Sequence, residues 1–530
     1  MTDCDVLIVG AGPVGLTLAI DLGRRGIKVM LVEQNLEPLK WPKMERCNAR
    51  TMEIFRHMEL AEEIRKASQF TDVPMDVFGV TALNEEPLVH LVYPSVTECK
   101  RQIEQCGDGS LNAEPYQLIS QYTLEPLLRR VAEREANIEV RFETRFLEFT
   151  QADDCVRAEV ETRTGTQYIN AQYLVGTDGG NSTVRKQLGT ILEGQGRITT
   201  LRQIFFRSDG LFDSILIGKG RHYWFPDATL VVQDDLRHFA IHTTAVDERS
   251  AEQVIRDLLG DDLDVDVLNE TPWRQNLLLV RNYSNGRVFL AGDSAHLVIP
   301  IGGLGLNTGI GDAIDLSWKL GATLQGWGGP ELLSSYEAER RPVAIRNREA
   351  SGRAARAMLR WRSFYSPLVH EDSPAGKKAR KRLIQEASAG LELCYGLDGV
   401  EFGYQYLGSP VICEQPGSGP QQLDFQYRPS TSPGCRLPHA WVGEGESIQD
   451  RIGPGYNLLD ISEEGVDWST FESAFCELGA PVHTHQLESA TLRRLSINTL
   501  MIVRPDLHIA WAGSTIPDDV SALVSRMTGN

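Results

Sequence analysis

The chain has 530 residues, 42% of them hydrophobic and 24% charged, which is enough for two or three domains with large cores. Its formal net charge of −19 argues against a nucleic-acid partner, because such proteins neutralise phosphates with an excess of basic residues. The nine cysteines include no Cys-x-x-Cys pair, so we expect no disulfide framework, no metal site and a reducing, cytoplasmic location. No signal peptide is visible, and no apolar run reaches the roughly 18 residues of a membrane span.

The first predicted elements are a strand, a glycine turn and a helix. An apolar run over 6–9 is typical of a buried parallel strand, and Gly10, Gly12 and Gly15 follow it. A helix over 16–26 and a second strand over 28–32 come next, with Glu33 at the strand end. The first glycine permits the turn, the second lets the backbone approach a pyrophosphate, and the third lets helix and strand pack closely. This order predicts an adenine dinucleotide site, and the acid disfavours NADP there.

The middle of the chain is rich in predicted strands. Residues 202–207, 221–225, 228–232 and 238–242 have the β-branched and aromatic composition of an antiparallel sheet. Because successive side chains of a strand point to opposite faces, only one of Tyr223 and Trp224 can line a pocket, and ordinary sheet packing explains either equally well.

A second glycine-rich segment follows a predicted strand over 287–291. Asp293 can accept hydrogen bonds from sugar-like hydroxyls, and the loop over 300–307 holds Gly302, Gly303 and Gly305. Such a loop lets the backbone approach a flat ring. A helix over 309–320 would direct its positive dipole end toward a reduced isoalloxazine. Together with the first motif, this segment predicts flavin binding.

These motifs resemble those of the class A flavoprotein monooxygenases, which share the fold of p-hydroxybenzoate hydroxylase. Besides the segments at 10–15 and 292–307, Gly176–Gly179 with Asp178 resembles a third motif of that family. The resemblance covers roughly residues 1–350. It implies bound FAD, NAD(P)H as a transient co-substrate without a nucleotide fold of its own, and O2. The implied FAD contacts are Gly10, Gly12, Pro13, Gly15, Glu33, Gln34, Lys43, Arg50, Gln121, Asp178, Asp293, Pro300, Gly303, Gly305, Leu306 and Asn307.

Segments near 404–410, 433–441 and 504–511 resemble the C-terminal, thioredoxin-like domain of the phenol hydroxylase and 3-(3-hydroxyphenyl)propionate hydroxylase branch. Without a Cys-x-x-Cys motif this domain should be redox-inactive, serving packing or oligomerisation, for example in a homodimer. The expected fold is therefore α/β: a Rossmann-like FAD-binding domain, an inserted antiparallel-sheet substrate domain and a thioredoxin-like C-terminal domain. The expected bounds are 1–75, 110–185 and 280–345 for the FAD-binding domain, 76–109 and 186–279 for the substrate domain, 346–420 for a helical segment and linker, and 421–530 for the C-terminal domain.

The resemblance implies hydroxylation of a phenolic substrate through a flavin C4a-hydroperoxide, with the protein excluding water and ionising the phenol. His222, Tyr223, Trp224 and Pro300 are candidate pocket residues, and His222, His238 or His242 could assist the deprotonation. Two alternatives stay open: oxidative rearrangement or ring cleavage of a polycyclic natural-product intermediate, and a non-catalytic flavin-binding protein. A flavin halogenase is disfavoured, since no Trp-x-Trp pair occurs. Ile299 stands where the family commonly has a proline, near the expected substrate.

Overall fold

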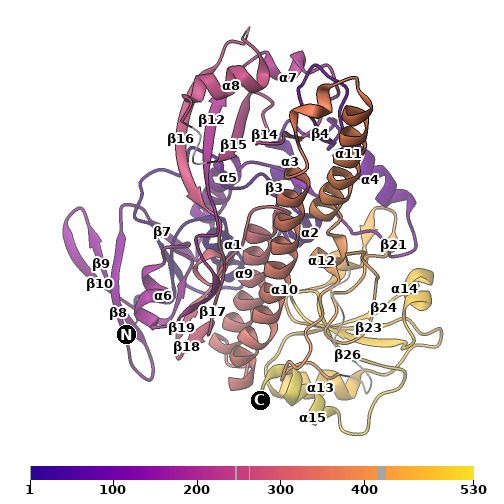
Figure 1. Ribbon diagram of the computed structural model, residues 1–530. Helices are drawn as coiled ribbons and strands as arrows, with labels where there is room; N and C mark the ends of the chain where they lie inside the picture. The colour runs from indigo at the N-terminus through magenta and orange to yellow at the C-terminus, as the bar shows by residue number, and fades with distance from the viewer. Residues whose placement is uncertain (1, 245–247, 262, 415–424) are drawn as a thin grey trace.

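The computed structural model describes residues 2–244, 248–261, 263–414 and 425–530 (Figure 1). Its first sheet has a parallel core in the order β19-β10-β1-β2-β7, with β18 added antiparallel at one edge and a β8–β9 hairpin extending from β10. The strand bounds are β1 (Cys4–Val9), β2 (Val29–Val32), β7 (Ile138–Arg141), β8 (Arg145–Gln151), β9 (Val156–Thr162), β10 (Gly165–Gly176), β18 (Ser284–Asn285) and β19 (Val288–Leu290). All four residues of β2 are buried, as expected for a strand covered on both faces.

Helices cover this sheet and place the glycine motifs at the carboxyl ends of its strands. In chain order they include α1 (Pro13–Arg24), α2 (Ala49–His57), α3 (Ala61–Lys66), α5 (Gln121–Arg134), α6 (Thr183–Leu188) and α9 (Leu304–Leu324). Helix α4 (Val96–Gln105) lies away from this sheet and belongs to a different core. Helix α9 starts five residues before the predicted 309. It does so because Gly303 takes a left-handed conformation with φ of 65°, which ends the loop and lets the chain turn directly into a helix. Gly305, Leu306 and Asn307 therefore lie in the first turn of α9.

The predicted antiparallel sheet is confirmed as a seven-stranded sheet, in which only the β4–β13 pair is parallel. Its order is β16 (Asp266–Arg274), β12 (Thr200–Arg207), β15 (His238–Thr244), β14 (Ala228–Val232), β13 (His222–Trp224), β4 (Val77–Gly79) and β5 (Val89–Leu91). Helix α8 (Ala251–Leu259) packs its apolar side against one face. In Figure 1 this sheet stands above the parallel sheet, and we call it the roof sheet.

Two long helices follow, α10 (Pro330–Arg362) and α11 (Pro374–Tyr395), with the short α12 (Asp398–Phe402) after them. The domain boundary expected between 345 and 346 falls inside α10. The polar run over 377–381 lies on α11 rather than in the loop that precedes it. Helix α10 runs beside both α9 and α11 (Figure 1), so it connects the first sheet to the roof.

The C-terminal part is an α/β unit with a four-stranded sheet. Strands β23 (Tyr456–Asp460) and β24 (Val482–Gln486) are parallel, and β25 (Leu500–Val503) and β26 (Ile509–Gly513) continue the sheet antiparallel, with α13 (Ser469–Glu477), α14 (Ala490–Leu495) and α15 (Val520–Thr528) around it. Residues 404–413 belong to this unit too, because Tyr406 and Ile412 are in its core and the Cys413 N–H donates to the Ala510 carbonyl. We therefore define the C-terminal unit as residues 404–414 and 425–530; the linker expected at 415–420 lies outside the described residues.

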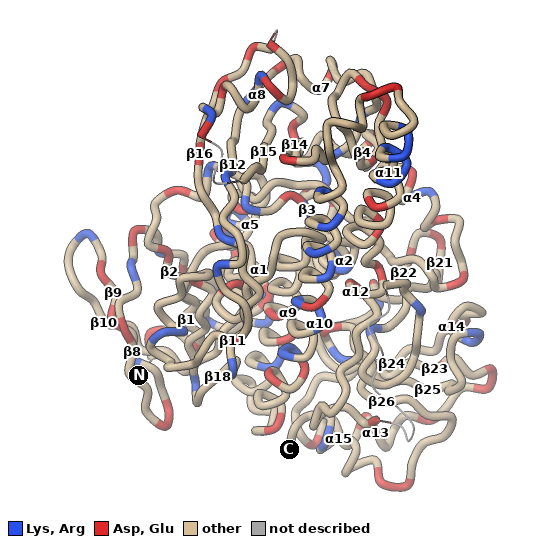
Figure 2. Tube along the Cα trace, in the orientation of Figure 1, with Lys and Arg blue, Asp and Glu red and all other residues tan. Residues whose placement is uncertain are grey.

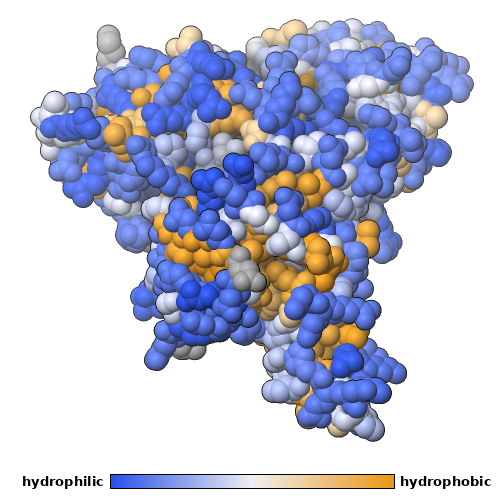
Figure 3. All heavy atoms as spheres, turned by 90° about the horizontal axis from the view of Figure 1, so that it is seen from above, coloured by the Kyte–Doolittle hydropathy of each residue, from blue (hydrophilic) through white to orange (hydrophobic). Residues whose placement is uncertain are grey.

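Basic and acidic residues are interspersed along all parts of the chain (Figure 2). Seen from above, the surface is mostly hydrophilic, with apolar side chains gathered toward the centre of that face (Figure 3). All nine cysteines are free thiols. Among the described residues no helix combines the length and the apolar character that a bilayer crossing requires.

Candidate flavin and substrate site

The N-terminal glycine turn leaves an open cradle before α1. A Cβ on Gly10 would lie 2.6 Å from the Thr177 carbonyl oxygen, and one on Gly15 would lie 2.1 Å from the Gly10 carbonyl oxygen. Both positions therefore exclude any side chain. Gly12 differs: it is the N-cap of α1, no side chain caps the helix there, and a Cβ would meet nothing within 4 Å. The free N–H groups of α1 thus face open space, which fits a pyrophosphate.

Glu33 stands beside this cradle at the end of β2. One carboxylate oxygen accepts the Ala11 N–H at 3.0 Å, and the other accepts the Asn35 N–H at 2.9 Å. The carboxylate is thereby fixed next to the glycine turn, where the ribose of an adenine dinucleotide would lie. Gln34 and Lys43 are exposed in the same region.

Asp293 follows β19 at the carboxyl edge of the parallel sheet, and we call the solvent-accessible region bordered by Gly12, Glu33 and Asp293 the cleft. Its side chain reaches solvent and accepts no hydrogen bond from the described residues, yet burial by surrounding protein raises the pKa of its carboxyl, opposed by His296 and Lys43. The exposure of the side chain and its raised pKa both fit a carboxylate that solvent can reach but hydrates poorly. A partner with hydroxyl donors, such as a ribityl chain, would satisfy it.

The segment around Asp178 holds the backbone next to Asp293 in place. The Asp178 carboxylate accepts the Ser182 hydroxyl and the N–H groups of Thr183 and Val184, so it caps α6. Arg185 on that helix donates to the Ser294 carbonyl at 3.1 Å. Asp178 therefore organises the backbone next to Asp293, and its own oxygens are already occupied.

The glycine loop and the first turn of α9 follow Asp293 along the chain. No side chain caps α9 at Gly303, so the backbone N–H groups of Gly305 and Leu306 are available for the pyrimidine edge of a flavin. The Asn307 side chain is occupied instead: it accepts the Asn48 N–H at 2.9 Å and the Thr51 hydroxyl at 2.7 Å, which ties α9 to α2. Pro300 is exposed before this turn.

Two other predicted contacts have different outcomes. Gln121 is the first residue of α5, and its amide donates to Glu125 at 2.9 Å. Glu125 also accepts the Leu39 N–H at 3.3 Å, which places Gln121 beside the segment that follows Glu33. Arg50 is buried, and its Nη2 donates to the Asp506 carbonyl at 2.9 Å. Its Nε and Nη1 are buried without a hydrogen-bond partner among the described residues, so its contact with FAD stays a prediction.

Strand β13 of the roof sheet separates the predicted pocket residues by face. Tyr223 is fully buried in the roof core, stacked on Phe78, and its hydroxyl donates to the Gly218 carbonyl at 2.8 Å. It is a packing residue rather than a pocket residue. His222 and Trp224 point to the other face, toward Tyr395 at the end of α11.

A chain of polar groups crosses that face. The Trp224 indole N–H donates to the Tyr395 hydroxyl at 2.6 Å, the Tyr395 hydroxyl bonds Nδ1 of His222, and Nε2 of His222 lies 2.7 Å from Glu45. Since an indole can only donate, the Tyr395 proton is directed to His222, and His222 then donates to Glu45. Burial would raise the pKa of Glu45, but His222 and Arg221 bring it below its ordinary value. Glu45 and Tyr395 were not predicted from the sequence.

The other two predicted histidines have separate environments. Burial lowers the pKa of His242 to about 4, and the Trp273 indole lies 3.2 Å from its Nδ1, so it is a neutral acceptor. In the roof sheet His242 pairs with Thr229, which in turn pairs with Trp224. His238 pairs with Asp235 and packs on Phe205 and Tyr122. It therefore lies apart from the hydrogen-bonded groups of Tyr395, His222 and Glu45.

A buried arginine lies beside these polar groups, and we call the cluster of Arg221, His222, Trp224 and Tyr395 the roof pocket. The Arg221 guanidinium lies 4.7 Å from the Tyr395 ring centre and within 6.0 Å of Tyr93 and Tyr116, while no carboxylate of the described residues forms an ion pair with it. Arg46 is paired with Glu401 and donates to the Gly302 carbonyl at 3.1 Å. It thus links the residues beside Glu45 to the glycine loop, so pocket and cleft adjoin.

The residues of the cleft fit FAD: an uncapped helix end, an open Gly12, a ribose carboxylate and an unsatisfied Asp293. Residues 3–351 match the family described as FAD binding domain, and the chain belongs to that family. It is a FAD-dependent monooxygenase of class A, with NAD(P)H as the implied reductant, which sets aside the non-catalytic alternative.

Three similar proteins cover nearly the whole chain. The FAD-dependent monooxygenase apdD of Emericella nidulans is 30% identical over 99% of this chain and 90% of its own. A putative polyketide hydroxylase of Streptomyces halstedii is 32% identical over 96% of this chain and 92% of its own. The crystal structure of RebC, a rebeccamycin biosynthetic enzyme with bound 7-carboxy-K252c, is 32% identical over 99% of both chains, with a TM-score of 0.90.

Proposed function

We propose that this enzyme hydroxylates a phenolic aromatic substrate bound between the flavin cleft and the roof sheet, using NAD(P)H and O2. The observation that carries the proposal is the chain Tyr395–His222–Glu45, which ends beside the glycine loop. FAD, once reduced and exposed to O2, supplies an electrophilic oxygen. The task of the protein is then to orient the phenol, exclude water and remove its proton.

The geometry supports one proton path. Tyr395 keeps its own proton, because burial raises its pKa well above the ordinary value, although Arg221 opposes this. A substrate hydroxyl that donates to the Tyr395 oxygen can pass its proton to that oxygen while Tyr395 passes its own to Nδ1 of His222. The imidazolium formed would lie against Glu45, at 2.7 Å, and the phenolate would lie near Arg221, which forms no ion pair with an acid among the described residues. One proton leaves the substrate and one reaches His222, so the step is balanced.

The test compares Tyr395→Phe with Tyr223→Phe, because both remove one buried hydroxyl near β13. We expect Tyr395→Phe to lower kcat about 100-fold with a weakly acidic phenol and much less with a strongly acidic phenol that is already ionised. Tyr223→Phe should stay within about twofold. Product formation is measured against pH for both phenols; an equal loss with both in Tyr395→Phe would contradict the proton path.

The FAD contacts of this cleft are part of the same proposal. We assign the pyrophosphate to the α1 N-terminus at Gly12, the ribose to Glu33, the ribityl chain to Asp293 and the pyrimidine edge to the first turn of α9. The open space at Gly12 and the unsatisfied Asp293 carboxylate support these positions.

A second candidate is the oxidation, rearrangement or cleavage of a polycyclic natural product. It is favoured by the similarity over nearly the full chain to a putative polyketide hydroxylase and to RebC. Single-ring phenols and multi-ring polyketide phenols would be compared for NAD(P)H consumption and product mass. Gain of one oxygen atom without ring opening supports hydroxylation, whereas other mass changes support the second candidate.

A further inference from the structure

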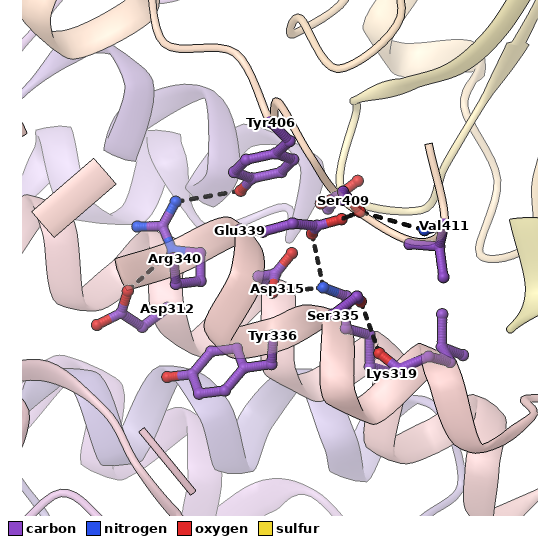
Figure 4. Close-up of polar contacts among 12 residues, drawn as sticks. Asp312, Asp315, Lys319, Ser335, Tyr336, Glu339, Arg340, Tyr406, Ser409 and Val411 are labelled. Atoms are coloured by element: carbon purple, nitrogen blue, oxygen red, sulfur yellow. Dashed lines mark hydrogen bonds and ion pairs between the residues drawn. The ribbon is translucent and has the colours of Figure 1, made fainter. Parts of the chain in front are cut away.

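A buried cluster of charged side chains joins α9, α10 and the C-terminal unit; Figure 4 shows most of it. Each of its side chains is at most 3% exposed. Helix α9 and α10 contribute acids and bases on facing sides, and the C-terminal unit adds a tyrosine, an arginine and an aspartate. We call this cluster the clasp: Asp312, Asp315, Lys319, Glu339, Arg340, Tyr406, Arg504 and Asp506.

One arm of the clasp holds the C-terminal unit against the two helices. Arg504 donates to Glu339 at 2.6 Å and to Asp315 at 3.1 Å, and Lys319 bridges the same two acids at 2.6 and 2.8 Å. Burial raises the pKa of Asp315 well above its ordinary value. Burial acts the same way on Glu339, but Arg504 and Lys319 bring its pKa below the ordinary value.

The clasp places three bases against four acids. Its bases are Lys319, Arg340 and Arg504, and its acids are Asp312, Asp315, Glu339 and Asp506; the raised pKa of Asp315 lessens the excess of negative charge. Such an arrangement gives little stability compared with apolar packing, because each ion loses its hydration. What it does provide is a single allowed geometry, since a shifted partner leaves a buried charge unpaired.

The other arm leads to the flavin cleft. Arg340 donates to the Tyr406 hydroxyl at 3.1 Å, to Asp312 at 2.8 Å and to the Thr308 carbonyl at 3.0 Å. The second oxygen of Asp312 accepts the Gly292 N–H at 3.1 Å and lies 2.7 Å from His296. The contacts thus end at Gly292 and Thr308, which are adjacent in sequence to Asp293 and Asn307.

The Arg340 guanidinium packs closely against the backbone of α9. A Cβ on Gly311 would lie 2.6 Å from Nη2 of Arg340, so the close approach to α9 needs a glycine there. Gly292 has a φ of 62°, and its N–H is held in that conformation by Asp312. A displacement of Arg340 would therefore move both the turn before Asp293 and the first turn of α9.

We propose that the C-terminal unit is a positioning element of the flavin site. Its Tyr406 hydroxyl orients Arg340, Arg340 orients Asp312, and Asp312 fixes the turn that presents Asp293. Tyr406 is a positioning residue, because it touches neither the cleft nor the roof pocket. This role depends on FAD binding and not on the identity of the substrate.

The test removes only the Tyr406 hydroxyl. Tyr404→Phe is the matched control, since Tyr404 packs on the same His508 ring and its hydroxyl makes no hydrogen bond within the described residues. We expect Tyr406→Phe to raise the Kd of the apoprotein for FAD about 5- to 50-fold and to alter the visible circular dichroism of bound FAD. The Tm of the apoprotein should change by less than about 4 °C. Tyr404→Phe should match the wild type in Kd and spectrum.

Two results would overturn the proposal. The first is an unchanged Kd and spectrum in Tyr406→Phe. The second is a loss of FAD affinity that is accompanied by a large fall in the Tm of the apoprotein, since this indicates a general loss of structure. Arg340→Lys keeps the charge but loses the forked contacts and is a second test. A rise in the Kd for FAD that exceeds the rise in Tyr406→Phe supports the proposal, and wild-type FAD binding contradicts it.

Discussion

The flavin cleft and the clasp use the same helix, α9, in opposite ways. At its N-terminus the helix is uncapped, and nearby Asp293 has no hydrogen-bond partner among the described residues. At its middle, Asp312, Asp315 and Lys319 are fully buried and each has at least one charged partner. The cleft leaves polar groups without a partner, and a ligand can satisfy them. The clasp pairs its charged groups with one another, which fixes the orientation of α9, α10 and the C-terminal unit. Along this helix, the unpaired polar groups therefore lie where a ligand would bind. The paired groups lie where α9 must be held against α10 and the C-terminal unit.

The largest expected effect comes from breaking the clasp. Arg504→Met removes the base that pairs with Glu339, Asp315 and Asp506, and should cost about 3–5 kcal/mol of unfolding free energy because buried acids lose their partner. The control is Arg360→Met, whose ion pair with Glu386 is exposed and should contribute less than about 1 kcal/mol. Denaturant unfolding of both apoproteins measures the loss of unfolding free energy in each variant. An equal loss in Arg504→Met and Arg360→Met would contradict the distinction between the buried and the exposed ion pair.

Removing the unsatisfied carboxylate of the cleft should have the next largest effect. Asp293→Ala is expected to raise the Kd for FAD about 100-fold, the loss expected for charge-assisted hydrogen bonds. The exposed Asp209→Ala serves as control. Flavin absorbance after gel filtration reports retention; an Asp293→Ala protein that retains FAD as the wild type does would exclude Asp293 from the ribityl contact.

The two glycines of the N-terminal turn offer a smaller and more selective comparison. Gly12→Ala should weaken FAD binding about tenfold and leave the apoprotein stable, because the methyl group would occupy the open cradle at a permitted φ of −71°. Gly15→Ala should instead destabilise the apoprotein, since its Cβ would clash with the Gly10 carbonyl. Thermal melts and FAD titrations separate the two, and the same pattern in both variants would contradict the open cradle.

The smallest effect is a pH dependence of apoprotein stability. Because folding raises the pKa of Asp293, the folded state holds this proton more tightly than the unfolded chain does. The contribution of Asp293 is therefore fully present below its ordinary pKa and is lost as pH rises through the raised value. Relative to Asp293→Asn, the wild-type apoprotein should lose stability across that window, as measured by Tm against pH. A flat difference would show that the carboxylate is well hydrated.

The sequence was most informative where function depends on contiguous residues. The glycine turn, Glu33 and Asp293 stand out in the sequence because a phosphate cradle and a ribityl contact would need small residues and acids at short, fixed spacings; their roles toward FAD stay predictions. The strands of the roof sheet were also predictable from their composition. The start of α9 was not, since it depends on the left-handed Gly303.

Residues that meet through distant parts of the chain could not be predicted. Tyr395 and Glu45 are 173 and 177 residues from His222, and neither belongs to a local motif. The hydrogen bond from Arg50 to Asp506 joins residues that are 456 positions apart, so no local motif could predict it. The direction of a helix side chain is set by what packs against it, and the sequence pattern of α2 contains no information about the C-terminal unit.

The ionisation of a bound phenol tests the account most directly. A chromogenic phenol is titrated by absorbance while bound to the oxidised enzyme, in the wild type and in Tyr395→Phe. The chain from Tyr395 to Glu45, together with Arg221, predicts that the phenol binds as phenolate at a pH where it is protonated in water, and that Tyr395→Phe loses this effect. A bound phenol that titrates as it does in water, or equally in both proteins, would contradict the account.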